Sequence, residues 1–597
     1  MSPKPEPGQP PRLVGQWRSL VAAGADPLPW LQACRAQAES GALPHAWIAL
    51  ADAAQWQAQL ALLAQRLAEA LPRTELVRRY PLLGVPFAVK DNIDIAGVPT
   101  TAGCPAFART PARSATVVQR LVDAGALWLG KTNLDQFATG LVGTRSPFGR
   151  PSSVFDAARI SGGSSSGSAV AVAGGQVAFA LGTDTAGSGR VPAGFNGLVG
   201  LKPTPGRVSA AGVLPACRTL DCVSVFAHTV DDAALLLALI EGNDAADDYC
   251  SFVAGPARLP AAARVGVPKQ PVFMGDAGYA PAFARAVEQA RTLGLRPVEI
   301  DCAPLFEVAA LLYEGPWVAE RHSVVQRVLA DRPEAIDPAV RQVIGRAAAF
   351  TATATFEAQY KLRHLQRRLR SLWQQVEVLM VPTAPGHPRF DEVDADPLGV
   401  NARLGTYTNF VNLLGWSALA LPAGRTELGL PFGVTFIAPG AHDAALLELG
   451  RRWEGSGAAA PDTPAPATEP VLPIAVVGAH LSGLPLNGQL RERGAVLREA
   501  TRTAPHYRLY ALPGTQPPKP GLQRVAEGGS AIELEVWDMP QAEVGSFLAL
   551  IPPPLGLGSV QLADGRHVHG FLCEAHALTG ARDISHHGGW RAYLSTL

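Results

Sequence analysis

Three segments carry most of the information in this chain: Leu82 to Lys90 (LLGVPFAVK), Ser161 to Ser168 (SGGSSSGS) and Gly182 to Pro192 (GTDTAGSGRVP). The first is an apolar run that ends on a lysine, and the other two are loops rich in glycine and serine. A serine hydroxyl is a weak nucleophile unless a neighbouring base takes its proton. The three segments therefore predict a relay of two serines and one lysine that works without histidine.

These segments resemble the amidase signature family, whose catalytic triad is a serine, a second serine joined by a cis peptide bond, and a lysine. The resemblance implies that Ser188 is the nucleophile, Ser164 the bridging serine and Lys90 the base. Ser165 is an alternative bridging residue, but the interval of 24 residues before Ser188 favours Ser164. The family fold implied is α/β, with a mixed sheet flanked by helices.

Lys90 can accept a proton only if its amine is neutral. An exposed lysine has a pKa of about 10.4 and is charged at neutral pH. Because Phe87 and Val89 flank Lys90, we expect burial to lower its pKa. The alternative is an ion pair with Asp91 or Asp94, which would keep the lysine charged.

The loop around Ser188 is rich in small residues, and backbone amides in such a turn can converge on one oxyanion. We expect the oxyanion hole to consist of four consecutive amides, those of Thr185, Ala186, Gly187 and Ser188. Asp184 and Arg190 flank this turn, and we expect them to fix it through a salt bridge.

Nearly the whole chain resembles the allophanate hydrolases within this family. In those enzymes a tyrosine and an arginine hold the carboxylate of the substrate, and Tyr313 and Arg321 match them in Tyr313 to Arg321 (YEGPWVAER). An arginine fork suits a carboxylate because it pairs through two hydrogen bonds. Eight residues of continuous helix span about 12 Å, so the two side chains converge only if Pro316 breaks the helix or the arginine reaches back.

The resemblance implies that Ser188 attacks the terminal amide of allophanate, a small anion, and releases ammonia. The other product, N-carboxycarbamate, then loses carbon dioxide. No metal or organic cofactor is implied. Two other hypotheses stay open: an amidase or amidotransferase component with a different amide substrate, and a non-catalytic scaffold.

We divide the chain into a helical N-terminal part (1–75), a catalytic core (76–454), a linker (455–470) and a smaller C-terminal α+β domain (471–597). Apolar residues recur every three or four positions from Trp47 to Leu71, which predicts a helix there. Short apolar strands then alternate with alanine-rich helices, as in an α/β domain. The linker is rich in proline and alanine.

The C-terminal domain resembles the domain appended to allophanate hydrolases, with a γ-glutamyl cyclotransferase-like fold. His480, in Val477 to Asn487 (VGAHLSGLPLN), is our candidate for a role in decarboxylation, since histidine exchanges protons near neutral pH. A purely structural histidine and a domain that serves only in assembly are the open alternatives. The cluster of late histidines does not have the spacing of a metal site.

Charge and composition exclude several classes of partner. Basic and acidic residues both number 51, so no basic field is present to attract nucleic acid or an anionic membrane. The chain shows no apolar run long enough for a membrane span, and its seven scattered cysteines fit a reducing cytoplasm. None of the four methionines lies in the context of a biotin-carrying lysine, so we expect a separate urea carboxylase as functional partner. We also expect the chain to form a homodimer.

Overall fold

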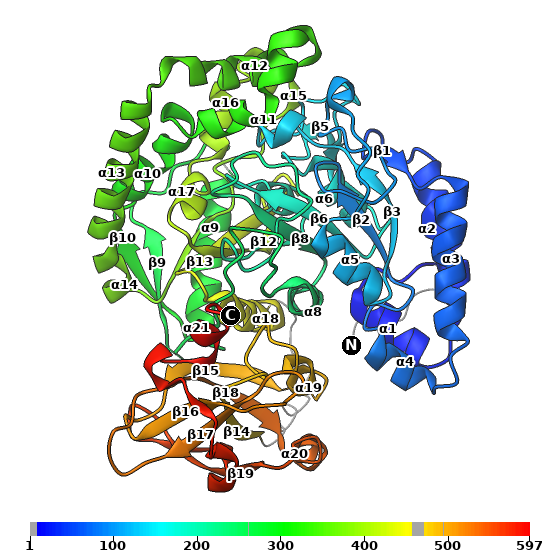
Figure 1. Cartoon of the computed structure of the whole chain (residues 1–597). Coiled ribbons are helices and arrows are strands. Elements are labelled where there is room, and N and C mark those ends of the chain that lie inside the picture. Colours follow the sequence, from blue (N-terminus) through cyan, green and yellow to red (C-terminus); the bar gives the residue numbers. More distant parts are fainter. Residues whose placement is uncertain (1–8, 261, 277, 457–470, 494) are drawn as a thin grey trace. The chain divides into compact units, whose positions relative to one another are not determined.

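The computed structural model of the 597-residue chain describes residues 9–260, 262–276, 278–456, 471–493 and 495–597. These residues form two compact units (Figure 1). Unit 1 comprises Met1–Cys250 and Pro260–Ala458, and unit 2 comprises Ser251–Leu259 and Ala459–Leu597. Most of the expected linker, from residue 457 to 470, lies outside the described residues.

Unit 1 is built on one mixed sheet of eleven described strands in the order β1-β3-β2-β6-β8-β7-β12-β13-β11-β9-β10. The strands are β1 (Trp47–Leu50), β2 (Pro86–Lys90), β3 (Leu127–Thr132), β6 (Phe179–Asp184), β7 (Val199–Lys202), β8 (Cys222–Ala227), β9 (Arg264–Pro268), β10 (Arg296–Ile300), β11 (Val378–Pro382), β12 (Ser417–Arg425) and β13 (Pro431–Ala438). Strands β3, β2 and β6 are parallel neighbours, as are β11, β9 and β10. The predicted mixed sheet is confirmed. A separate hairpin pairs β4 (Ser152–Ser153) with β5 (Asp156–Ile160).

Helices surround this sheet. They are α1 (Val14–Ala22), α2 (Leu28–Glu39), α3 (Ala53–Leu67), α4 (Arg73–Arg79), α5 (Thr116–Asp123), α6 (Ser166–Ala173), α7 (Val191–Phe195), α8 (Val230–Ile240), α9 (Tyr279–Thr292), α10 (Ala303–Glu314), α11 (Val318–Asp331), α12 (Pro338–Gly345), α13 (Ala352–Arg368), α14 (Leu372–Gln375), α15 (Phe390–Ala395), α16 (Gly399–Leu404), α17 (Asn409–Leu413) and α18 (Asp443–Ser456). In Figure 1, α2 and α3 lie beyond β1 at one edge of the sheet, and α10 and α13 lie beside β10 at the other.

The predicted helix over 47–71 is shorter than expected, because Trp47–Leu50 is an edge strand that pairs antiparallel with β3. Helix α3 begins only at Ala53. Asp52 caps it: the Asp52 carboxylate accepts the Gln55 amide at 2.8 Å, and the Gln55 side chain accepts the Asp52 amide at 3.0 Å. Such a reciprocal pair fixes the start of a helix.

Strands β2 and β6 are completely buried, because both faces of this part of the sheet are covered. They run parallel, with Val89 opposite Leu181. Their carboxyl ends therefore meet at the same edge of the sheet. Lys90 lies at that end of β2, and the loop that carries Ser188 follows β6.

Unit 2 contains a five-stranded sheet in the order β15-β18-β14-β20-β19 and a three-stranded sheet in the order β17-β16-β21 among its described residues. Its strands are β14 (Val471–Val476), β15 (Val496–Arg502), β16 (Tyr507–Ala511), β17 (Pro520–Arg524), β18 (Glu533–Pro540), β19 (Leu555–Gln561), β20 (His567–Cys573) and β21 (Arg582–Asp583). Its helices are α19 (Asn487–Arg491), α20 (Gln541–Leu548) and α21 (Trp590–Leu594).

The core of unit 2 includes residues from a distant part of the chain. Phe252, from the stretch Ser251–Leu259, is buried in the same cluster as Tyr507 and Trp590. The Ala257 amide also donates to the carbonyl of Arg498 in β15 at 2.9 Å. Nothing in the sequence indicated that this stretch packs with the second unit.

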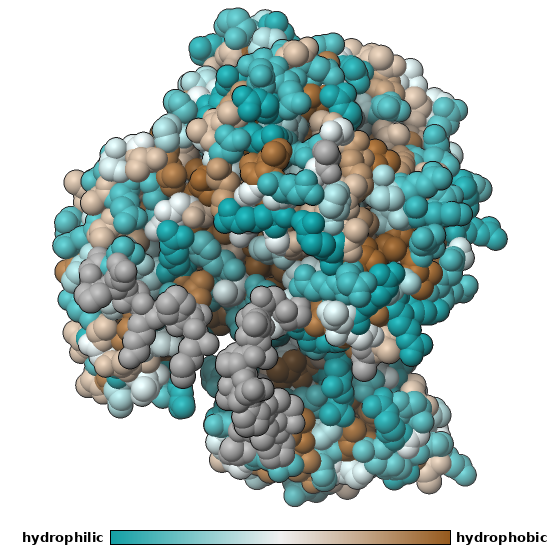
Figure 2. Space-filling view, turned by 180° about the vertical axis from the view of Figure 1, so that it is seen from behind, coloured by the Kyte–Doolittle hydropathy of each residue, from teal (hydrophilic) through white to brown (hydrophobic). Residues whose placement is uncertain are grey.

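Hydrophilic residues cover much of the face shown in Figure 2, where hydrophobic residues form separate patches. Among the helices described here, none combines the length and the apolar character needed to cross a bilayer.

Candidate active site

Lys90, Ser164 and Ser188 form a continuous hydrogen-bonded chain. The Lys90 amine Nζ donates to Ser164 Oγ at 2.8 Å, and Ser164 Oγ donates to Ser188 Oγ at 3.0 Å. All three side chains are buried. Ser165 lies outside this chain, since its hydroxyl donates to the carbonyl of Thr183 at 3.2 Å. Three segments far apart in the sequence therefore converge, and Ser164 rather than Ser165 is the serine that bridges.

The local structure explains this convergence. Lys90 is the last residue of β2, and Ser188 follows the parallel strand β6. Ser164 follows a cis peptide bond with Gly163 and lies two residues before α6, whose N-cap is Ser165. A Cβ atom on Gly163 would lie 2.1 Å from Asp135 Oδ2, so only glycine fits beside the bridging serine.

Burial lowers the pKa of Lys90 to about 7. The alternative ion pairs predicted for this lysine do not form. Asp91 pairs with Lys131 at 3.0 Å, and Asp94 pairs with Arg109 at 2.8 Å. Lys90 is thus free to exist as a neutral amine close to physiological pH, as a base requires.

Thr183 and Asp135 belong to the site but were not singled out from the sequence. Lys90 Nζ donates a second hydrogen bond to Thr183 Oγ1 at 2.7 Å. Asp135 is fully buried, accepts the Gly143 amide at 3.0 Å, and packs against the loop of Ser164. The parallel register of β2 and β6 could have pointed to Thr183, but no sequence pattern places Asp135 there.

The predicted salt bridge between Asp184 and Arg190 is confirmed. Two bonds of 2.9 Å join their fully buried side chains. The Asp184 carboxylate also accepts the amides of Gly187 at 2.8 Å and Gly189 at 3.0 Å. The carboxylate therefore holds both sides of the turn that carries Ser188.

These contacts change one expectation about the oxyanion hole. The Gly187 amide already donates to Asp184, so it is not a free donor. The amides of Thr185, Ala186 and Ser188 have no such acceptor among the described residues. Gly187 instead supplies the turn itself: its φ is +134°, and a Cβ atom there would lie 2.4 Å from Thr408 Oγ1.

Tyr313 and Arg321 come together because the helix between them is broken. Helix α10 ends at Glu314, Gly315 is extended, and α11 begins at Val318. The guanidinium carbon of Arg321 consequently lies 5.4 Å from the ring centroid of Tyr313. Of the two alternatives predicted from the spacing, the break at Pro316 is the one that occurs.

The Arg321 guanidinium is buried but only partly paired. Its Nη1 donates to Thr139 Oγ1 at 3.1 Å and to the Ala138 carbonyl at 3.3 Å. Its Nε and Nη2, and the Tyr313 hydroxyl, have no hydrogen-bond partner among the described residues. Burying such donors unpaired is costly. Three unpaired donors at one place indicate a site for an anion.

One short segment joins this candidate anion site to Ser188. Arg321 contacts Ala138 and Thr139, and Ser188 Oγ donates to the Gly140 carbonyl at 3.4 Å. Phe137 and Ala138 have φ values of 51° and 53°, which non-glycine residues seldom adopt. Two carbonyls of this segment thus accept hydrogen bonds, one from Arg321 and one from Ser188.

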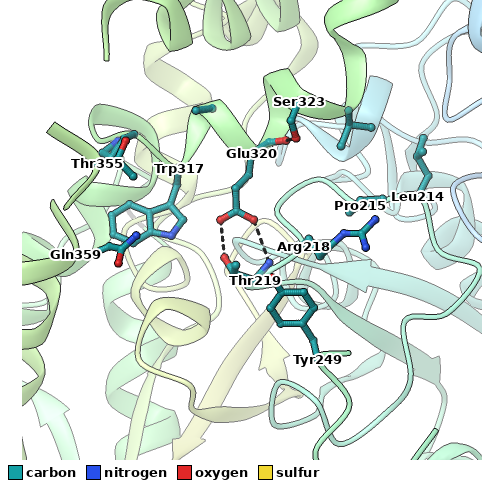
Figure 3. A pocket seen from close by; sticks show the side chains of 13 residues that line it. Leu214, Pro215, Arg218, Thr219, Tyr249, Trp317, Glu320, Ser323, Thr355 and Gln359 are labelled. Carbon is teal, nitrogen blue, oxygen red and sulfur yellow. Dashed lines mark hydrogen bonds between the residues drawn. The ribbon is translucent and has the colours of Figure 1, made fainter. Parts of the chain in front are cut away.

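A cavity of about 680 Å³ lies beside α11. Figure 3 shows Glu320 reaching across it to the backbone and hydroxyl of Thr219, with Trp317 and Arg218 nearby. Its lining residues are Leu214, Pro215, Arg218, Thr219, Tyr249, Pro316, Trp317, Ala319, Glu320, Ser323, Val324, Thr355 and Gln359. The three triad residues are not among them, but Glu320 lies on α11, the helix that carries Arg321, and Trp317 is the N-cap residue of that helix.

In unit 2, His480 is half-buried and lines a small cavity of about 30 Å³ together with Lys519. Its Nε2 lies 2.9 Å from Gln489 Oε1, and its ring packs edge-on against Phe547. Burial lowers the pKa of His480, which favours the neutral imidazole. Across the described residues, no group of three or more histidine, cysteine, aspartate or glutamate side chains has a metal-binding arrangement.

Comparison with known proteins connects both units to characterised families. The Amidase family matches residues 49–447, and the Allophanate hydrolase C-terminal domain matches residues 472–595. The urea amidolyase of Saccharomyces cerevisiae is 44% identical over 581 residues, which is 93% of this chain and 31% of that protein. The chain thus spans less than a third of the length of this relative.

Two further relatives match over most of their own length. The solved structure of Kluyveromyces lactis allophanate hydrolase is 40% identical, with a TM-score of 0.72, and the match covers 98% of this chain and 99% of that one. One component of the glutamyl-tRNA(Gln) amidotransferase of Deinococcus deserti is 34% identical, over 75% of this chain and 97% of that protein.

Proposed function

This chain belongs to the amidase family, and we propose that it is an allophanate hydrolase in which Ser188 is the nucleophile. The observation that carries the proposal is the set of unpaired donors on Tyr313 and Arg321, joined to the nucleophile through the segment 137–140. Allophanate has a carboxylate at one end and a primary amide at the other. It therefore offers an acceptor to the buried donors and a carbonyl to the serine.

The triad removes the proton from the nucleophile in two steps. Ser188 Oγ passes its proton to Ser164 Oγ, and Ser164 passes its own proton to the neutral Lys90 amine. Hydroxyl groups can donate in either direction, so the hydrogen-bonded chain reverses without moving a heavy atom. As Ser188 attacks the amide carbon, the carbonyl oxygen becomes an oxyanion facing the amides of Thr185 and Ala186 and that of Ser188 itself.

Collapse of the tetrahedral intermediate breaks the carbon–nitrogen bond. Lys90 returns the proton through Ser164 to the departing nitrogen, which leaves as ammonia. A water molecule, deprotonated by the same relay, then attacks the acyl-enzyme and releases N-carboxycarbamate. Arg321 and Tyr313 hold the carboxylate throughout, which keeps the reacting carbonyl in place.

N-carboxycarbamate then loses carbon dioxide, and we propose that His480 in unit 2 assists this step. The neutral imidazole beside Lys519, at a small cavity, supports this role. We further propose that the chain acts as a homodimer on the product of a urea carboxylase. The likeness to urea amidolyase supports the metabolic link.

A second amide substrate is the main alternative, since part of the chain is also similar to a component of an amidotransferase. A non-catalytic scaffold is the other. The intact hydrogen-bonded triad favours catalysis over the scaffold. The unpaired cationic donors favour an anionic substrate over an uncharged one.

Ammonia release by the purified protein tests the proposal, with allophanate compared with biuret, malonamate, glutamine and a simple aliphatic amide. We expect a strong preference for allophanate, and no turnover of any amide by Ser188→Ala. Ser165→Ala is the matched control: its hydroxyl is outside the relay, so turnover should persist. Residual hydrolysis by Ser188→Ala would refute the mechanism, and turnover of simple amides alone would refute the substrate.

A further inference from the structure

The loop from Leu214 to Asp221 contacts both the oxyanion turn and helix α11. At its end, the Asp221 carboxylate accepts the hydroxyl of Thr185, the first residue of the oxyanion turn. The same carboxylate accepts the amides of Ala216 at 2.7 Å and Cys217 at 3.2 Å. Asp221 therefore ties the Thr185 side chain to the turn that contains Ala216 and Cys217.

The other side of this loop is tied to α11, the helix that carries Arg321. The Cys217 thiol donates to the Trp317 carbonyl at 3.6 Å. The Thr219 amide donates to the Glu320 carboxylate at 3.0 Å, and the Thr219 hydroxyl donates to the same group (Figure 3). Glu320 directly precedes Arg321.

A third contact joins Leu220, near the end of the loop, to Asp184, the last residue of β6. The Asn412 side-chain amide donates to the carbonyl of Asp184 at 2.8 Å and to that of Leu220 at 3.0 Å. One short loop is thus connected to the oxyanion turn, to the strand end that precedes it, and to the anion-binding helix.

We propose that Asp221 is a positioning residue. It orients the oxyanion turn through Thr185, and through the loop 214–221 it sets the distance between the oxyanion turn and Arg321. Oxyanion donors act only when they are aimed at the place where charge develops, and displacement by about 1 Å can reduce a rate about 100-fold. An allophanate bound by its carboxylate at Arg321 reaches the oxyanion amides only if this distance is fixed. This second part rests on the proposed substrate.

The test is a comparison of Asp221→Asn, Thr185→Val and Thr185→Ser. Removing either partner of the hydrogen bond between Thr185 and Asp221 should lower kcat about tenfold or more on every amide that the protein hydrolyses, with little change in KM. Thr185→Ser keeps the hydroxyl and should restore kcat. The double variant Asp221→Asn/Thr185→Val should lose no more than either single variant, because both remove the same contact. Additive losses, or an unchanged kcat in Thr185→Val, would overturn the proposal.

The second part is tested with Thr219→Val, which removes one bond between the loop and α11. It should raise KM for allophanate about two- to tenfold and leave kcat on an uncharged amide unchanged. Arg327→Ala, whose side chain is exposed on α11 and does not line the cavity, is the control. Equal KM values in Thr219→Val and the wild type would contradict the link to α11.

A readout without substrate separates this proposal from the proposed function. The rate at which a sulfonyl fluoride modifies Ser188, followed by mass spectrometry, depends on the same oxyanion turn. We expect slower modification in Thr185→Val and Asp221→Asn than in Thr185→Ser and Arg327→Ala. Equal rates would refute the positioning role, even if allophanate were not the substrate. If Asp221→Asn does not fold, the two Thr185 variants decide the question alone.

Discussion

In the proposed mechanism Lys90 must lose its proton before Ser188 can attack, and the environment of Lys90 sets the pH at which this happens. Burial lowers its pKa to about 7. The value of kcat/KM should therefore rise with pH, reach half its plateau near pH 7, and stay level above it, because the neutral amine is the active form. A profile measured from pH 5.5 to 9 with wild-type protein checks this expectation. A rate that is flat across that range, or that rises only near pH 10, would contradict the role of Lys90.

At the same scale, the sequence could predict site residues that lie in a recognisable motif. It could not predict contacts between residues that are distant in the sequence and meet only in the fold. Lys90, Ser164 and Ser188 lie in motifs with distinctive neighbours, and the structure brings their side chains together. Asp221 and Thr185 are 36 residues apart, and no pattern in the sequence links them. The Gly187 amide was expected in the oxyanion hole because the sequence does not show that Asp184 takes it.

At the scale of elements, α6 places Ser164 only if it packs closely on its neighbours. A Cβ atom on Gly167, in its first turn, would lie 2.1 Å from the Ala46 carbonyl oxygen and 2.6 Å from the Asn133 nitrogen. Both are backbone atoms, so the helix itself must shift. Gly167→Ala should lower the free energy of unfolding by about 1–3 kcal/mol and reduce kcat, as urea denaturation and turnover assays would measure.

Gly345→Ala, at the end of helix α12, is the matched control. A Cβ atom there meets nothing within 4 Å, and alanine favours helix over glycine. Stability and kcat should therefore stay level or rise slightly. Equal behaviour of the two variants would show that α6 tolerates displacement.

Element boundaries followed local chemistry that the periodic pattern alone does not reveal. The apolar spacing continues through Trp47–Leu50, yet the reciprocal cap at Asp52 starts the helix later and frees these residues to pair with β3. The break between α10 and α11 was foreseen as one of two alternatives because Pro316 cannot continue a helix without losing a hydrogen bond. The sequence could not show which alternative holds, since that depends on where Arg321 finds partners.

At the scale of the whole molecule, the proposed function divides the reaction between the two units. His480 lies in unit 2, and the triad lies in unit 1. His480→Ala should therefore leave the rate of the first ammonia release unchanged but slow the release of carbon dioxide. Carbon-13 NMR of labelled allophanate would show N-carboxycarbamate accumulating. His576→Ala, an exposed histidine of the same unit, is the control. Unchanged carbon dioxide release in His480→Ala would assign that histidine to structure alone.

The division into an α/β unit and a smaller α+β unit followed from the alternation of strands and helices. The order of the eleven strands did not, because neighbours such as β7 and β12 are more than 200 residues apart in the chain. The sequence does not predict that Ser251–Leu259 packs with unit 2, because this depends on the burial of Phe252 in the same core cluster as Trp590. Long-range packing of this kind has no local signature.

The central claim is that a buried arginine selects an anion for the serine to cleave. The most direct test is kcat/KM for allophanate and for biuret, which differs from it only in carrying an uncharged amide in place of the carboxylate. We expect the wild type to prefer allophanate by about 10- to 100-fold or more, as charge-assisted hydrogen bonds allow. Arg321→Gln should abolish that preference and leave biuret turnover unchanged, whereas Arg327→Ala, with its exposed side chain on the same helix, should keep it. Equal values for the two substrates in the wild type, or equal losses on both in Arg321→Gln, would contradict the account.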